Sequence, residues 1–84
     1  MKDYTPYRHT FLVHQWTHVP VRDEWLHPNH VFGIHKPMLK EVREWLDNHK
    51  GGCYAILEDE DTFTDVAIAF SNERDAAFFL LRWS

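Results

Sequence analysis

The stretch of residues 51–83, GGCYAILEDEDTFTDVAIAFSNERDAAFFLLRW, decides the expected fold. It contains two short apolar runs, 53–57 and 65–70, whose β-branched and aromatic residues favour strands. The acidic segment between the two runs predicts a hairpin loop. Ser71–Asn72 supplies side chains that can cap a helix, and the apolar pattern that follows predicts a helix over 73–83. The stretch therefore predicts a β-hairpin followed directly by a helix.

A second helix is predicted immediately before this stretch. Its start is indicated by Pro37, because the first turn of a helix tolerates the missing N–H of proline. Its end is indicated by Gly51 and Gly52, since glycine favours helix termination. Between these limits one apolar stripe recurs at helical spacing, formed by Leu39, Val42, Trp45, Leu46 and His49.

The N-terminal half is expected to be mainly extended. Residues 8–16 alternate in a way that predicts a strand partly buried on both faces. Pro28 limits 23–26 to a single helical turn, and residues 31–34 predict a short extended piece. The fold class is therefore α+β, with one domain over residues 1–84 in the order β-α-β-β-α. We expect an antiparallel three-stranded sheet with two helices on one face.

The first strand of that order is expected at an edge of the sheet. A bare edge presents unpaired backbone N–H and C=O groups, which invite pairing with another chain. A homodimer formed through the sheet edge is therefore expected.

Composition places the chain among globular proteins. It has 84 residues, of which 44% are hydrophobic, and its four tryptophans, three tyrosines and six phenylalanines are enough for a small core. The single cysteine, Cys53, cannot form a disulfide within the chain, which points to a reducing cytoplasm. No apolar run reaches the ~20 residues of a membrane span. The start, MKDYTPYRHT, lacks the apolar core of a signal peptide.

The net charge of −4 is unevenly distributed. Residues 1–50 contain seven Lys and Arg against six Asp and Glu, whereas residues 51–84 contain two against seven. An acidic half disfavours direct nucleic-acid binding, which uses basic clusters against phosphates. The acidic segment is expected to be a solvated loop or a patch that docks on a basic protein surface. Its charged residues are Glu58, Asp59, Glu60 and Asp61.

Six of the seven histidines lie in residues 9–35. His27, His30 and His35 are the first candidates for a metal site, because a turn at Pro28–Asn29 would bring them together. No HExxH or paired-cysteine motif accompanies them. We therefore interpret the histidines of this stretch as amphipathic residues packed among aromatic side chains, and we expect no metal or other cofactor. A histidine-rich metal-binding protein is the alternative.

The remaining motifs indicate no catalytic site. Cys53 could act as a nucleophile only beside an activating histidine, and a buried structural thiol is the commoner role of a lone cysteine. The run DEDTFTD resembles the start of a calcium loop. However, Thr64 occupies the position that needs glycine, and Phe70 the position that needs glutamate. We therefore expect no catalytic residue and no enzyme activity.

The predicted last helix is apolar almost all round. Such a helix is covered on more than one side, either by the rest of the chain or by a partner. For Phe78 and Leu81, the sequence leaves open whether the rest of the chain or a partner covers the side chain. Arg82 and Trp83 are of the types that most often anchor interfaces. The expected protein-binding residues are Phe78, Leu81, Arg82 and Trp83 of this helix and Glu58, Asp59, Glu60 and Asp61 of the acidic segment.

The C-terminal sequence AFSNERDAAFFLLRWS resembles the ending F-x4-DA-x2-F-x-LRW-(G/S) of small uncharacterised proteins encoded by tailed bacteriophages. The preceding VREWLDNHKGG and the early HTFLV fit the same pattern. At Leu80 this chain departs from the many such proteins that carry lysine, which makes its helix more apolar. The matched positions are Phe70, Asp75, Ala76, Phe79, Leu81, Arg82 and Trp83.

The resemblance implies a phage-encoded accessory protein that acts in the cytoplasm of a bacterial host, and it transfers no catalytic residue. We expect a small non-catalytic protein that binds and modulates a host or phage protein. Neither a membrane nor a nucleic acid is expected as a partner. A self-assembling structural component of the virion is the alternative from another functional class.

Overall fold

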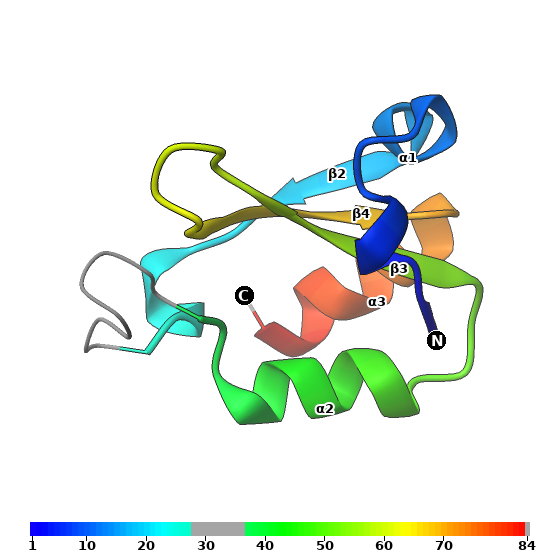
Figure 1. The fold of residues 1–84 in the computed structure, drawn as a ribbon. Coiled ribbons are helices and arrows are strands. Elements are labelled where there is room, and N and C mark those ends of the chain that lie inside the picture. The colour runs from blue at the N-terminus through cyan, green and yellow to red at the C-terminus, as the bar shows by residue number, and fades with distance from the viewer. Residues whose placement is uncertain (28–36, 84) are drawn as a thin grey trace.

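The computed structural model describes residues 1–27 and 37–83 of the chain. It shows an α+β fold around a mixed four-stranded sheet with the strand order β1-β3-β4-β2 (Figure 1). The strands are β1 (Lys2–Asp3), β2 (Thr17–Pro20), β3 (Cys53–Glu58) and β4 (Asp65–Phe70). The helices are α1 (Phe11–Gln15), α2 (Lys40–Asn48) and α3 (Glu73–Trp83), and the 3-10 turns are η1 (Thr5–Tyr7) and η2 (Asp23–Trp25). Within the described ranges, none of these helices has the length and apolar character needed to cross a membrane.

The predicted hairpin is present as β3 and β4. The two strands pair antiparallel, with Tyr54 opposite Phe70 and Ile56 opposite Ile68. Because side chains alternate along a strand, these four side chains point to one face of the sheet, while the smaller Ala55 points to the other. The helix α3 follows the hairpin directly. The prediction of a hairpin followed by a helix is therefore confirmed.

The predicted strand over 8–16 is wrong. The short helix α1 occupies Phe11–Gln15, and β2 begins only after it. The local reason is Thr10, whose hydroxyl oxygen accepts a hydrogen bond from the N–H of Val13 (3.4 Å). The carbonyl oxygen of Thr10 also accepts a hydrogen bond from the N–H of His14 (3.2 Å). These local bonds start a helical turn and override the apolar alternation.

The sheet also differs from the expected antiparallel three-stranded sheet in strand number and order. β1 pairs in parallel with β3, with Lys2 opposite Cys53, so that the sheet is mixed. A strand of two exposed residues has no periodicity of its own, which is why the sequence pattern does not indicate it. β2 pairs antiparallel with β4, so β1 and β2 form the two edges.

The β2 edge offers little for the addition of another strand. The N–H of Val21, directly after β2, donates to the carbonyl oxygen of Val66 in β4 (2.9 Å). Because alternate residues of a strand direct their backbone groups to opposite sides, His18 and Pro20 direct theirs away from the sheet. Pro20 has no N–H to donate, and proline is a common protection of edge strands. A homodimer through this edge would have to rely on the N–H of His18.

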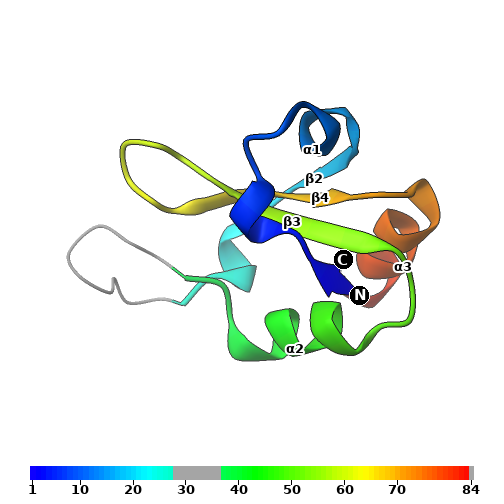
Figure 2. The ribbon, with the colours of Figure 1, turned by 45° about the vertical axis from the view of Figure 1, so that its right-hand side comes forward.

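Two helices cover one face of the sheet, as expected, and the third lies on the other face (Figures 1 and 2). On the first face, Val42 and Leu46 of α2 and Phe79 of α3 belong to the larger core cluster. On the second face, Val13 of α1 belongs to a smaller cluster with the buried Ala55 of β3. The sheet therefore separates two surfaces of different construction.

The helix α2 begins after Leu39 rather than at Pro37, because the residues before it make other contacts. Met38 forms an isolated β-bridge with Leu26, and the N–H of Leu39 donates to the carbonyl oxygen of Trp25 (2.7 Å). These contacts tie the entry of α2 to the 3-10 turn η2, which is the single helical turn predicted upstream.

Candidate functional site

A groove of about 380 Å³ lies between α2 and α3. The α2 residues that line it are linked by steps of three or four positions, so they share one side of the helix. Two of the residues expected to bind a partner, Arg82 and Trp83, line it from α3. The described lining is Glu41, Glu44, Trp45 and Asn48 of α2, His49 directly after it, and Arg82 and Trp83 of α3.

Aromatic side chains form the base of the groove. The ring of Phe79, which is fully buried, lies with its centroid 5.5 Å from that of Trp45 and 6.5 Å from that of Trp83. Trp45 also stacks on His49, with ring centroids 4.4 Å apart and planes 13° apart. Because each ring is held by a neighbour, a ligand would find the base already ordered and would not have to immobilise it.

On α3, Arg82 lines the groove, and Phe78 lies beside it, four residues earlier on the same flank of the helix. The guanidinium carbon of Arg82 lies 4.2 Å from the centroid of the Trp83 ring, a cation–π geometry. Phe78 packs with its ring centroid 5.5 Å from that of His49, yet 45% of the residue remains exposed. Leu81 is 79% exposed and lies outside the core. Both residues left open by the sequence therefore contribute to the surface.

The two walls of the groove differ in charge. Glu41 and Glu44 are exposed on α2, while Arg82 stands on the α3 wall. Nζ of Lys40 lies 3.6 Å from Oε1 of Glu44, but both side chains are largely exposed and such pairs are weak. The α2 wall therefore remains an acidic surface that favours a basic group of a ligand.

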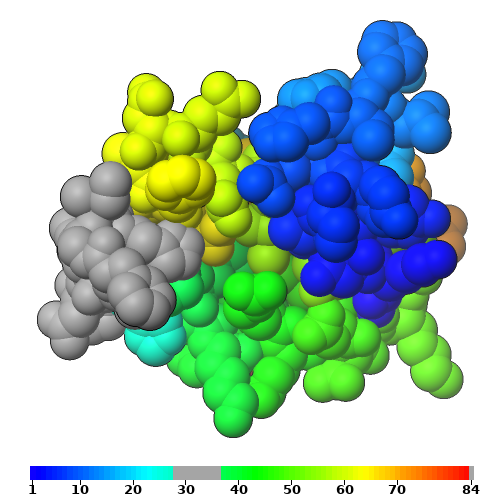
Figure 3. Space-filling view, in the orientation of Figure 1, coloured from blue at the N-terminus to red at the C-terminus, as the bar shows by residue number. Residues whose placement is uncertain are grey.

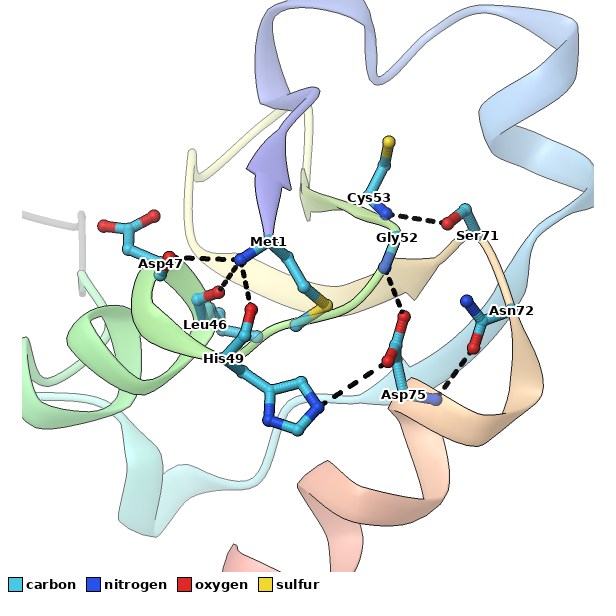
Figure 4. A network of polar contacts seen from close by, with 9 residues as sticks. All are labelled: Met1, Leu46, Asp47, His49, Gly52, Cys53, Ser71, Asn72 and Asp75. Carbon is cyan, nitrogen blue, oxygen red and sulfur yellow. Dashed lines mark hydrogen bonds and ion pairs between the residues drawn. The ribbon is translucent and has the colours of Figure 1, made fainter.

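A polar network lies at the His49 end of the groove (Figure 4). Asp75 is buried in the first turn of α3, and its backbone N–H donates to Oδ1 of Asn72 (3.0 Å). One carboxylate oxygen of Asp75 accepts a hydrogen bond from the N–H of Gly52 (2.9 Å). The other lies 3.6 Å from Nε2 of His49. The network links the end of α2, the following turn and the start of α3, and so it positions His49 in the groove.

The glycine pair between α2 and β3 has a second role besides ending the helix. A Cβ atom on Gly51 would overlap the carboxylate of Asp75, and a Cβ atom on Gly52 would overlap the hydroxyl of Ser71. Only glycine lets the backbone approach α3 this closely without moving those side chains. The turn and the network therefore depend on each other.

The α-amino group of Met1 lies against the last turn of α2 (Figure 4). It donates hydrogen bonds to the carbonyl oxygens of Leu46 (3.0 Å), Asp47 (3.1 Å) and His49 (2.5 Å). A positive charge is favourable there, because the last carbonyl groups form the negative end of the helix dipole. The N-terminal segment is thus tied to the helix that carries most of the groove.

Cys53 lies apart from the histidine of the polar network. Its thiol points away from the imidazole of His49, the titratable ring of the polar network (Figure 4). Its backbone N–H donates to the hydroxyl oxygen of Ser71 (2.7 Å), so the hydroxyl is also engaged in structure. Within the part of the chain that the structure describes, Cys53 is half-buried and free of any disulfide. The arrangement fits a structural thiol.

The four described histidines of the N-terminal half are not packed as interpreted from the sequence. His27 is exposed, as are the three histidines before it, and the stacking on tryptophan is made by His49 instead. Among residues 1–27 and 37–83, no group of three or more His, Cys, Asp and Glu side chains is placed to hold a metal ion. The candidates His30 and His35 lie outside the described residues.

The four acidic residues before β4 do not form one uncommitted patch. Oε2 of Glu58 lies 3.5 Å from the guanidinium of Arg8. Oδ1 of Asp59 accepts a hydrogen bond from the N–H of Asp61 (2.8 Å), which holds the loop in an Asx-type turn. In the described chain, the side chains of Glu60 and Asp61 make no hydrogen bond or ion pair. Two carboxylates, rather than four, are thus open to a partner, and neither lines the α2–α3 groove.

The sequence did not indicate the α2 wall of the groove. Trp45 and His49 were expected in the buried stripe of the helix, but they lie at its border and are half-buried. A usable signal is the placement of Glu41 and Glu44 beside them, because acidic residues that flank an apolar stripe mark where it meets solvent. Searches against protein-family models, curated proteins and solved structures give no match to this chain.

Proposed function

We propose that the protein is a non-catalytic binding module that docks a partner protein in the α2–α3 groove. The observation that carries the proposal is that two half-buried tryptophans, Trp45 and Trp83, meet Arg82 in one groove. Tryptophan and arginine dominate the binding energy of protein interfaces when they sit in well-packed pockets. The aromatic base supplies the packing, and the groove supplies the concave shape.

The exposed part of α3 extends this surface beyond the groove. Phe78 and Leu81 are exposed on adjacent turns, next to the arginine of the groove. Contiguous apolar surface on a folded protein marks an interaction site more often than scattered single residues do. A partner that fills the groove would therefore also cover these two side chains.

The charges of the groove define the chemistry and orientation of the partner. A basic side chain of the partner would lie along Glu41 and Glu44, and an acidic one near Arg82. Such complementary placement contributes specificity and association rate more than affinity. By the resemblance of the C-terminus, the partner would be a host or phage protein in a bacterial cytoplasm, modulated by occupation of its surface.

The groove lacks the parts of a hydrolytic or transfer enzyme. Its described lining contains no serine, threonine, cysteine or lysine. The lining therefore offers His49 no nucleophile to activate. This composition supports binding over catalysis.

The test is an affinity capture from bacterial lysate, identified by mass spectrometry. The bait is the affinity-tagged protein. We expect one stoichiometric partner, lost with Phe78→Asp and with Arg82→Glu but retained with Leu12→Asp. Phe78, beside the groove, and Arg82, in its lining, are both exposed at the surface, so the variants should melt within a few degrees of the wild type.

A partner that is retained in both groove variants contradicts the assignment of the groove. Capture of nothing but the protein itself favours the virion alternative. Gel filtration over a range of concentrations then decides, because a self-assembling component gives a ladder of sizes and a binding module gives one sharp species.

A further inference from the structure

A second apolar surface lies on the opposite side of the sheet from the α2–α3 groove. It is formed by η1 and α1, where Tyr7, Phe11 and Leu12 are 59%, 72% and 68% exposed. Figures 1 and 2 both place α1 across the sheet from α2. In Figure 3 the N-terminal segment, in blue, forms a broad part of the visible face. This surface is therefore spatially independent of the groove.

A cleft of about 220 Å³ opens in this surface. An apolar cavity of about 150 Å³ is large enough to bind benzene, so the cleft is large enough for one leucine or phenylalanine side chain. The hydroxyl of Thr10 is engaged with the N–H of Val13, which leaves the walls almost entirely apolar. We term it the N-terminal cleft; its lining is Tyr4, Tyr7, Thr10, Leu12, Val13 and Trp16.

The walls of the N-terminal cleft are fixed by contacts with the sheet. The N–H of Tyr4 donates to the carbonyl oxygen of Tyr54 in β3 (2.7 Å). The hydroxyl oxygen of Thr5 accepts a hydrogen bond from the N–H of Ile56 (3.1 Å). The rings of Tyr4 and Trp16 pack edge to face with centroids 5.7 Å apart. A preformed apolar cleft binds an inserted side chain without first having to order its own walls.

The charges beside the cleft favour an acidic occupant. Residues 1–18 contain two basic residues and three histidines against one acidic residue, in a chain of net charge −4. The acidic residue, Asp3, is engaged with the N–H of Thr5 (2.7 Å) and with its hydroxyl. Nζ of Lys2 lies 5.2 Å from the centroid of the Tyr4 ring, at the cleft wall. Asp3 keeps its negative charge but is held at Thr5, whereas the amine of Lys2 is the charged group that lies against the cleft lining. The charge next to the Tyr4 wall is therefore positive.

The opposite border of the surface is already paired. A notch of about 210 Å³ separates the β3–β4 loop from the N-terminal segment, and Arg8 faces Glu58 across it. Figure 3 shows this loop in yellow beside the blue N-terminal segment. The acidic loop would repel an acidic ligand from that side. An acidic ligand would therefore approach from the side of Lys2.

We propose that the N-terminal cleft binds an acidic segment of a partner protein, which inserts one leucine or phenylalanine side chain between Tyr4, Leu12 and Trp16. Its carboxylates lie beside Lys2. A concave cleft sized for one side chain fits a peptide anchor better than it fits the flat surface of a lipid bilayer. Together with the groove, the cleft gives the protein a binding surface on each face of its sheet, so that one molecule can bridge two partners.

The probe is a short synthetic peptide of aspartate and glutamate with one central phenylalanine, titrated into isotope-labelled protein and followed by NMR. We expect shifts confined to the amides around the N-terminal cleft. Replacing the phenylalanine by alanine, or the acidic residues by lysine, should weaken binding by about tenfold or more. Leu12→Asp and Lys2→Glu change exposed side chains and should abolish or weaken binding in a folded protein. Leu81→Asp on α3 is the matched control and should bind as the wild type does.

Equal binding of the lysine peptide and the acidic peptide overturns the acidic occupant. Absence of shifts at the cleft with every peptide overturns the site. Co-sedimentation with vesicles of phosphatidylserine and phosphatidylcholine, lost in Leu12→Asp and without peptide binding, assigns the surface to a membrane instead. A dimer in sedimentation equilibrium that Leu12→Asp disrupts assigns it to a second copy of the chain instead. If this proposal fails, the proposed role of the α2–α3 groove still stands, because Leu12→Asp and Lys2→Glu lie outside the groove.

Discussion

Asp75 holds a carboxylate out of water at the point where α3 begins. A buried charge is costly unless hydrogen bonds and favourable charges compensate for it. Here the N–H of Gly52 and the imidazole of His49 stand against its two oxygens, and the positive end of the helix dipole adds to them. The side chain therefore sets how closely the turn after α2 can approach α3.

Substitution of Gly51, which faces Asp75, tests whether this side chain limits the approach of the turn to α3. Gly51→Ala should lower the free energy of unfolding by about 1–3 kcal/mol, because its Cβ overlaps the carboxylate of Asp75. In an Asp75→Ala background the same change should cost less, since the overlapping group is gone. Urea denaturation of the four proteins measures the coupling. Lys50→Ala, at an exposed neighbour, is the control. If Gly51→Ala lowers the free energy of unfolding equally in the wild type and in Asp75→Ala, the overlap with the Asp75 carboxylate is not the cause.

Tyr54 makes the free energy of unfolding decrease at alkaline pH. Its hydroxyl donates to Oδ1 of Asp47, and burial, followed by this hydrogen bond, raises the pKa of Tyr54 well above its ordinary value of 10.0. Above about pH 10 the unfolded chain loses the phenolic proton while the folded chain keeps it. Because the folded state then binds more protons than the unfolded state, the free energy of unfolding falls as the pH rises.

In Tyr54→Phe, the free energy of unfolding should therefore fall less steeply as the pH rises. At neutral pH the variant should lose about 1 kcal/mol, the usual net contribution of one hydrogen bond. Urea denaturation repeated from neutral pH to about pH 11 measures both effects. Tyr7→Phe, at an exposed tyrosine, should keep the wild-type slope. The same slope in Tyr54→Phe would show that another group causes the decline.

At the scale of the elements, α3 presents two faces with different roles. Phe79 faces the core, where its ring lies 5.0 Å from that of Trp25 and 5.5 Å from that of Phe70 between centroids. Phe78, the residue before it, lies on the flank beside the groove. Phenylalanine therefore stabilises the core at position 79 and forms part of the exposed surface at position 78.

Alanine substitutions should separate the two faces of α3. Phe79→Ala should lower the free energy of unfolding by about 3–5 kcal/mol, because it leaves a cavity among packed rings. Phe78→Ala should change it by no more than about 1 kcal/mol, as is usual at the surface. Thermal and urea denaturation measure both. Similar losses for the two variants would contradict the assignment of Phe78 to the surface.

The sequence predicts those elements that local patterns determine. The hairpin, α2 and α3 each have a clear apolar period and a stop or cap signal, and all three are present. α1 was missed because the hydroxyl of Thr10 starts a helical turn inside an alternating segment. β1 was missed because its pairing of Lys2 with Cys53 joins distant segments and leaves no periodicity to detect.

The candidate site was predictable only on its α3 side. Phe78, Arg82 and Trp83 stand out from the sequence because α3 has more apolar surface than one core can cover. The α2 wall depends on the distance and angle at which two helices pack, which is a property of tertiary structure. Sequence alone places Trp45 in the core stripe and cannot show that its edge reaches the groove.

At the scale of the whole molecule, the two faces of the sheet carry layers of different thickness. Helices α2 and α3 form a thick layer with an aromatic groove, and the N-terminal segment forms a thinner layer with an apolar cleft (Figures 1 and 2). The small Ala55 and Ala69 under the thinner layer let α1 lie close to the strands. The chain thus places the two proposed binding surfaces back to back within a very small fold.

The parallel pairing of β1 with β3 has a consequence for the order of folding. The hairpin and α3 are made from neighbouring residues, whereas β1 must return across half of the chain to reach Cys53. Contacts between distant segments carry the larger entropy of loop closure and form late. We expect the N-terminal segment to dock last and to detach first. Because the N-terminal cleft exists only while that segment is docked, a ligand held there would recognise only molecules that have completed folding.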